Sequence, residues 1–169
     1  MNLEYRSLLP NDFAPDSRVW VYQSSRLFTM SEALEIEDML NNFVANWNSH
    51  GAPVAGFGTL FFGRFIILVA DESSTGVSGC STDSSVRLIK SIEQKFAVNL
   101  FDRQNLAFVK NDKIELIPLG QFKYAAENGF IGPETLYFNN LIQTKYELEH
   151  TWLIPVKESW LASRMPVVS

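Results

Sequence analysis

VAGFGTLFFGRFIILVAD, the stretch from Val54 to Asp71, decides the fold of this chain. It consists of two apolar runs joined at Gly63-Arg64, and a glycine that leads a two-residue turn favours a type II′ β-hairpin. In this register Phe62 pairs with Phe65. Side chains alternate between the two faces of a strand, and here both faces are apolar. We therefore expect helices to cover one face and more chain or a second subunit to cover the other.

Two helices are predicted around this hairpin. A short strand is expected first, over residues 19–23. After it, Thr29 and Glu32 fit a capping box, and apolar residues at helical spacing give the next helix one buried face until Gly51 ends it. The second helix is predicted to begin near Thr82 or Asp83, again with a single apolar stripe. Both stripes are suited to packing on a sheet.

A second hairpin is predicted over residues 106–117, with a type I′ turn at Asn111-Asp112. In its register Val109 and Ile114 pair on an apolar face. The opposite face, which contains Phe108, also carries lysines and a glutamate and is expected to be partly exposed to water.

The remaining chain is expected to hold a short helix over residues 121–128 and another that begins at Gly132-Pro133-Glu134. The predicted order is β-α-β-β-α-β-β-α-α. Hairpins separated by helices are typical of an α+β fold, here with a largely antiparallel sheet of about five strands and helices packed on one face. We expect a single globular domain over residues 1–169, in which residues 144–169 form an irregular tail packed on the body.

Composition limits the classes of function. The chain has 14 Lys or Arg against 19 Asp or Glu, a net charge of −5, which argues against binding to nucleic acid or to an anionic membrane surface. A single cysteine, Cys80, excludes an intramolecular disulfide, and with two histidines it cannot form a Cys-rich zinc site. The longest strongly apolar run, residues 65–70, is too short to span a bilayer. We expect a soluble, cytoplasmic protein with no metal and no cofactor.

The strand from Phe65 to Glu72 ends in two acids, as a Walker B strand does, where the first acid would hold magnesium. Val77-Ser78-Gly79-Cys80-Ser81 is similar to the signature loop of an ABC transporter. With these segments and the helix end at His50-Gly51, the chain resembles a small family of uncharacterised bacterial proteins often labelled ABC-transporter ATPases. The resemblance implies no established activity. No Gly-Lys pair occurs in the chain, so the lysine-bearing phosphate loop is missing and ATP hydrolysis is not expected.

One local site is predicted where a polar loop enters the second helix. Free backbone N–H groups and the positive end of the helix favour a small anion or a cysteine thiolate there. Cys80 is a candidate nucleophile, and His50 is the histidine better placed to reach it. An ordinary helix start with a buried free cysteine accounts for the same residues. The candidate ligand-binding residues are Ser78, Gly79, Cys80, Ser81, Thr82, Asp83, Ser84 and Arg87.

These patterns support two functions of different class. The first is a non-enzymatic domain that binds a partner or forms a homodimer through the apolar hairpin. The second is a small-molecule or phosphate-binding protein, or a thiol enzyme, that uses the loop from Ser78 to Ser85. We favour the first, because a hairpin with two apolar faces needs cover on both.

Overall fold

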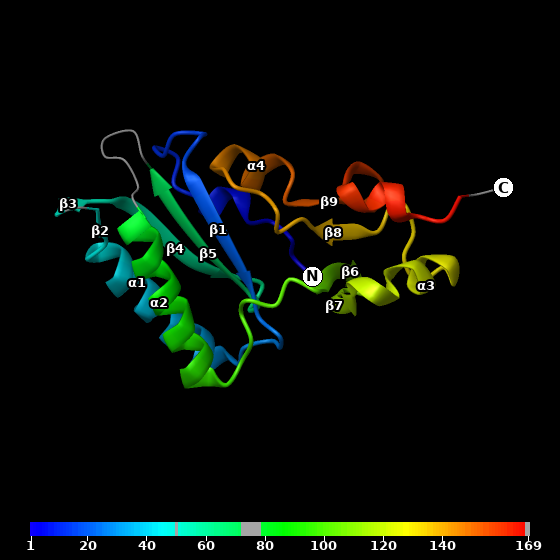
Figure 1. The fold of residues 1–169 in the computed structure, drawn as a ribbon, viewed down its shortest axis with the longest axis horizontal. Coiled ribbons are helices and arrows are strands. Elements are labelled where there is room, and N and C mark those ends of the chain that lie inside the picture. Colours follow the sequence, from blue (N-terminus) through cyan, green and yellow to red (C-terminus); the bar gives the residue numbers. More distant parts are fainter. Residues whose placement is uncertain (50, 72–78, 168–169) are drawn as a thin grey trace. The chain divides into compact units, whose positions relative to one another are not determined.

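The structure is a computed structural model that describes residues 1–49, 51–71 and 79–167 (Figure 1). The chain divides into two compact units, and each has a hydrophobic core of its own. The first, which we call the three-stranded unit, comprises Leu3–Phe101 and Ile142–Glu149. The second, the four-stranded unit, comprises Met1–Asn2, Asp102–Leu141 and His150–Ser169.

The three-stranded unit is an antiparallel sheet with two helices on one face (Figure 1). Its elements are β1 (Arg18–Gln23), α1 (Met30–Ala45), β2 (Asn48–Ser49), β3 (Ala52–Pro53), β4 (Ala55–Phe61), β5 (Phe65–Asp71) and α2 (Gly79–Phe96). The strand order is β1-β5-β4, and every residue of the central strand β5 is buried. Apolar residues of α1, α2 and β5, among them Leu40, Ile89 and Leu68, form the core between the helices and the sheet.

The first hairpin forms where the sequence predicts it, but its register differs by one residue. Phe62 (φ 56°) and Gly63 (φ 62°) both have a left-handed backbone, and the N–H of Arg64 bonds to the carbonyl of Phe61 at 3.1 Å. Phe61 therefore pairs with Phe65, and the predicted pairing of Phe62 with Phe65 is wrong. The sequence predicts a two-residue turn because a positive φ is uncommon for a bulky residue such as Phe62, which takes one here.

The observed register turns Gly56 and Gly58 toward α1. A Cβ atom on Gly56 would lie 2.7 Å from Cε3 of Trp47, and one on Gly58 would lie 3.3 Å from Cβ of Leu40. Strand β4 and helix α1 therefore approach each other most closely where the strand has no side chain.

Gly56→Ala is expected to lower the free energy of unfolding by about 1–3 kcal/mol, because the added methyl group overpacks the contact with Trp47. Gly120→Ala is the matched control, since a Cβ atom there meets nothing within 4 Å, and its effect should stay within about 0.5 kcal/mol. Guanidinium unfolding of both variants measures the difference. Equal effects of the two substitutions would contradict the close packing.

The second face of the first hairpin is covered by residues of the same chain. On β5 this face includes three side chains without exposed surface, Phe65, Ile67 and Val69. The ring of Tyr5, itself fully buried, lies 5.6 Å from that of Phe61 on the same face. The Tyr5 hydroxyl donates a hydrogen bond to the carbonyl of Leu148 in α4 (Lys145–His150) at 2.5 Å. The N-terminal segment thus takes the place for which a second subunit was considered, and the homodimer itself stays a prediction.

The four-stranded unit contains a second antiparallel sheet, with strand order β7-β6-β8-β9. Its elements are β6 (Asn105–Lys110), β7 (Lys113–Pro118), α3 (Phe122–Glu127), β8 (Leu136–Phe138) and β9 (Leu153–Pro155). The second hairpin is confirmed, because Asn111 and Asp112 have φ values of 52° and 63° and Val109 pairs with Ile114.

The face of this hairpin that was expected to be partly exposed to water also contains a buried aromatic residue. Phe108 has no exposed surface, and its ring stacks on that of Phe122 with 6.0 Å between the centroids. On the other face Val109 and Ile114 are half-buried, and Ala107 has no exposed surface. On the same face as Phe108, Lys110 and Glu115 are half-buried and Lys113 is exposed, so the expected partial exposure is confirmed for these residues, whereas Phe108 itself is covered.

Residues 132–138 form a turn and a strand where a helix was expected from Gly132-Pro133-Glu134. The hydroxyl oxygen of Thr135 accepts a hydrogen bond from the N–H of Gly132 at 2.9 Å, which closes the turn. Tyr137 then pairs with Phe108 of β6. Pairing with the sheet therefore outweighs the helix-opening signal of the proline.

The segment 144–169, expected to be an irregular tail, contains α4, β9 and two short 3-10 helices at Val156–Glu158 and Trp160–Arg164. The α+β class and the largely antiparallel pairing are confirmed, with the strands divided between separate sheets. The expectation of a single domain stays a prediction.

Candidate functional site

The predicted anion or thiol site lies at the start of α2. The helix begins at Gly79, earlier than the expected Thr82 or Asp83, so the backbone of Cys80 belongs to its first turn. Ser78 and His50, and the side chains of Cys80 and Ser81, lie outside the described residues. The proposed meeting of Cys80 with His50 therefore stays a prediction.

The described part of this site consists of polar groups that contact one another. The Ser85 hydroxyl donates to the carbonyl of Thr82 at 2.6 Å, and a guanidinium N–H of Arg87 donates to the Ser84 hydroxyl at 3.2 Å. Asp83 is exposed. An ordinary helix start makes contacts of the same kind, so the anion site stays a prediction.

Asp71, the first acid of the Walker-B-like strand, has a structural partner. It is 7% exposed, and its Oδ2 accepts a hydrogen bond from the backbone N–H of Ala14 at 3.2 Å. Glu72 lies outside the described residues. The Asp71 carboxylate therefore ties the N-terminal segment to the end of β5, a role that needs no nucleotide.

We expect no binding of magnesium-ATP, because no lysine-bearing phosphate loop accompanies Asp71. Isothermal titration calorimetry of the whole chain with magnesium-ATP should give only the heat of dilution. Micromolar binding that is lost in Asp71→Asn would contradict this expectation.

A groove of about 300 Å³ lies at the tip of the first hairpin, and we call it the hairpin-tip groove. Side chains of the segment before α1, of the first turns of α1 and of the hairpin line it, among them Leu27, Met30, Leu34, Glu37, Leu60 and Gly63. Three of these are large apolar side chains with high exposure: Leu27 at 57%, Met30 at 77% and Leu34 at 63%. All three belong to the three-stranded unit, so the unit presents a concave apolar surface beside its edge strand β4.

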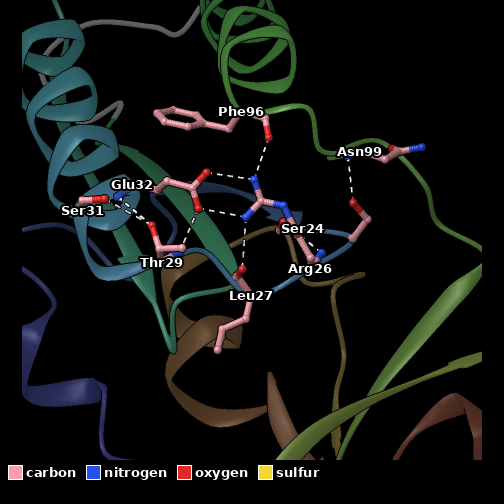
Figure 2. A network of polar contacts seen from close by, with 9 residues as sticks. Ser24, Arg26, Leu27, Thr29, Ser31, Glu32, Phe96 and Asn99 are labelled. Atoms are coloured by element: carbon pink, nitrogen blue, oxygen red, sulfur yellow. Dashed lines mark hydrogen bonds and ion pairs between the residues drawn. The ribbon is translucent and has the colours of Figure 1, made fainter.

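A polar network fixes the segment that carries Leu27 (Figure 2). The guanidinium of Arg26 donates two hydrogen bonds of 2.8 Å to the carboxylate of Glu32 and one of 2.7 Å to the carbonyl of Phe96. The predicted capping box is confirmed, since Thr29 and Glu32 exchange both of its hydrogen bonds. Arg26 thereby joins the start of α1 to the end of α2.

Gly63 shapes the other wall of the groove. Its φ of 62° is in the left-handed region, and an added Cβ atom would lie 3.1 Å from Cδ1 of Leu27. The turn therefore passes directly beneath the Leu27 side chain, and a glycine is needed both for the backbone conformation and for this contact.

The pKa of Glu32 is lowered from 4.5 to about 2, first by its hydrogen bonds from Arg26 and then by the backbone N–H of Thr29. Because the unfolded chain binds the proton more readily, the ionised carboxylate stabilises the fold above about pH 4.5. This contribution is lost as the pH falls toward about 2. Thermal unfolding followed between about pH 5 and pH 2 should therefore show a steeper fall in Tm for the wild type than for Glu32→Gln. Equal falls in Tm with pH for the two proteins would contradict a stabilising role of the Glu32 carboxylate.

The hairpin-tip groove is not predicted from the sequence, although one signal for it is present. The buried stripe of α1 includes Ile36 and Leu40, whereas Met30 and Leu34, four residues apart, lie outside it. Apolar residues on a second stripe of a surface helix indicate a second contact surface. Whether that surface stays exposed depends on where the tip of the first hairpin lies relative to α1, and the sequence pattern does not predict this.

A second groove, of about 550 Å³, lies in the four-stranded unit. It is lined by Phe122 and Met165 together with the cations of Lys123 and Arg164. Lys123 lies 3.8 Å from the Glu127 carboxylate, and the guanidinium of Arg164 lies 5.4 Å from the Trp160 ring centroid. Its cations thus already have partners within the unit.

Among residues 1–49, 51–71 and 79–167, no cluster of three or more His, Cys, Asp or Glu residues could hold a metal ion. Over the same residues, no helix has the length and hydropathy needed to cross a membrane.

Comparison with known proteins assigns no family to the chain. No protein-family model matches it, and neither a curated protein nor a solved structure does so. The resemblance to proteins labelled ABC-transporter ATPases stays a prediction. The function is therefore inferred from the surface of the molecule, where the hairpin-tip groove brings together exposed apolar side chains of the described residues.

Proposed function

We propose that this chain is a non-enzymatic interaction module that binds a segment of a protein partner in the hairpin-tip groove. The observation that carries the proposal is the exposure of Leu27, Met30 and Leu34 around one concavity. Full burial of a leucine or methionine side chain contributes about 1.5–3 kcal/mol. Three such side chains in one groove provide an apolar anchor site of the kind that protein partners use.

The groove lies on an ordered framework, which favours binding without a large conformational cost. The Arg26–Glu32 network holds one wall, and the turn at Gly63 forms the other. A preformed groove loses little conformational entropy when a ligand enters. This supports recognition of an external segment over closure of the groove by its own chain.

Charge favours a different protein over a second copy as the occupant. Helix α1 contains four acidic residues and no lysine or arginine. Glu32 and Glu35 pair with Arg26 and Lys95, whereas no described cation pairs with Glu37 or Asp38. A twofold dimer would bring this surface against itself, and like charges in contact oppose association. Light scattering at tens of micromolar should therefore find a monomer rather than the homodimer expected from the sequence. A dimer abolished by Leu34→Asp would instead show that a second copy occupies the groove. In this proposal the module acts in the cytoplasm, which suits a chain with one cysteine.

Site-specific photo-crosslinking tests the proposal. A photo-reactive residue in place of Met30 should form an adduct with a partner protein in cells, while the same residue in place of exposed Gln94 on α2 should not. The purified partner should bind the wild type directly and lose affinity for Leu34→Asp. Equal adducts at the two positions, or equal affinity for the two proteins, would overturn the proposal.

A further inference from the structure

We infer that Glu37 makes the hairpin-tip groove select partner segments that carry a lysine or arginine beside their apolar anchor. The inference rests on the proposed function and specifies the chemistry of the partner. Glu37 lies one turn beyond Leu34 on α1 and lines the groove together with Leu60. The groove thus combines an apolar concavity with one carboxylate at its wall.

One oxygen of the Glu37 carboxylate is held by the hairpin. Oε1 accepts a hydrogen bond of 2.7 Å from the backbone N–H of Leu60 and one of 3.1 Å from the hydroxyl of Thr59. These two contacts fix the orientation of a half-buried side chain. Among the described residues, no group donates a hydrogen bond to Oε2, so this oxygen is available to a ligand.

No described cation neutralises Glu37. Two other acids of α1 have partners, since Glu32 pairs with Arg26 and Glu35 pairs with Lys95. A carboxylate that is partly shielded from water and already oriented attracts an ammonium or guanidinium group more strongly than a mobile surface acid does. The unpaired charge in this groove is therefore that of Glu37.

The same contact determines how the partner can enter. Strand β4 is an edge strand, and exposed edges commonly accept an added strand. At Leu60 the outward N–H already donates to Glu37, so an added strand would lose a hydrogen bond there. Side-chain insertion beside Glu37 avoids that loss, which favours an anchor residue with a neighbouring cation over strand addition.

A random-peptide phage library, selected in parallel on the wild type, Glu37→Gln and Asp38→Asn, tests the inference. Glu37→Gln removes the charge but keeps an amide oxygen that can accept from Leu60 and Thr59. Asp38→Asn is the matched control, because Asp38 is the neighbouring exposed acid of α1 and does not line the groove. Groove dependence is established for each peptide by its loss of binding to Leu34→Asp.

Peptides from the wild-type selection should be enriched in Lys or Arg next to an apolar residue, and those from Glu37→Gln should not. A basic peptide should bind Glu37→Gln about two- to fivefold more weakly than the wild type, and Asp38→Asn with less than about a twofold change. Groove-dependent peptides without basic enrichment, or equal losses in the two variants, would overturn the inference and leave the groove function standing. A selection without any groove-dependent peptide would contradict both the inference about Glu37 and the proposed function of the groove.

Discussion

Tyr5→Ala is expected to lower the free energy of unfolding by about 3–5 kcal/mol, one of the two largest effects expected for this chain. The Tyr5 side chain has no exposed surface and packs against the rings of Phe61 and Phe62, at 5.6 and 6.3 Å between centroids. Alanine would leave a cavity on the second face of the sheet and remove the hydrogen bond to the carbonyl of Leu148. Urea unfolding, followed by tryptophan fluorescence, measures the loss.

Two further variants separate the contributions to this effect. Tyr5→Phe keeps the ring and removes only the hydrogen bond, so about 1 kcal/mol should be lost. Tyr124→Ala, at a tyrosine that is 71% exposed, should change stability by less than about 0.5 kcal/mol. A Tyr5→Ala protein as stable as the Tyr124→Ala protein would show that the N-terminal segment does not hold the second face.

Leu34→Asp is expected to weaken partner binding by at least about thirtyfold, because it removes one of the apolar anchors and places a charge in the groove. The fold should be unaffected, since the Leu34 side chain is 63% exposed and changes at such surface sites stay within about 0.5 kcal/mol. Fluorescence anisotropy with the photo-crosslinked partner, or with a groove-selected peptide, measures the affinity. Thermal unfolding of the same sample reports stability.

Leu141→Asp is the matched control for this substitution. Leu141 is 60% exposed, belongs to the four-stranded unit and does not line the hairpin-tip groove. Leu141→Asp removes a leucine and adds a negative charge, as Leu34→Asp does, but outside the groove. The affinity of this variant for the partner should therefore remain within about twofold of that of the wild type. Similar losses in the two variants would attribute the effect to net charge and contradict the proposed site.

The two hairpins show how far local sequence determines register. Asn111 and Asp112 tolerate positive φ readily, so the predicted type I′ turn and all of its pairs are observed. In the first hairpin, Phe62 takes a positive φ that its own preferences disfavour. The conformation is compensated by tertiary contacts, among them the ring of Phe62 against Tyr5. Those contacts depend on a segment more than fifty residues away, which a local pattern does not contain.

Burial is harder to predict than strand pairing, because it also depends on segments that are distant in the sequence. The pairing of Phe108 with Glu115 was predicted correctly, but its face is covered by α3 and by residues near the end of the chain. The hairpin-tip groove likewise combines α1 with a turn about thirty residues later. Sequence periodicity identifies which residues share a face, whereas the element that covers that face follows from the tertiary fold.

A methyl-resolved NMR titration with a groove-selected peptide tests the central claim, that the hairpin-tip groove binds a partner segment, most directly. The methyl signals of Leu27, Met30, Leu34 and Leu60 should shift as the peptide is added, while those of Leu161, buried in the four-stranded unit, should stay in place. A peptide that binds while the four groove residues keep their signals unchanged would contradict the account.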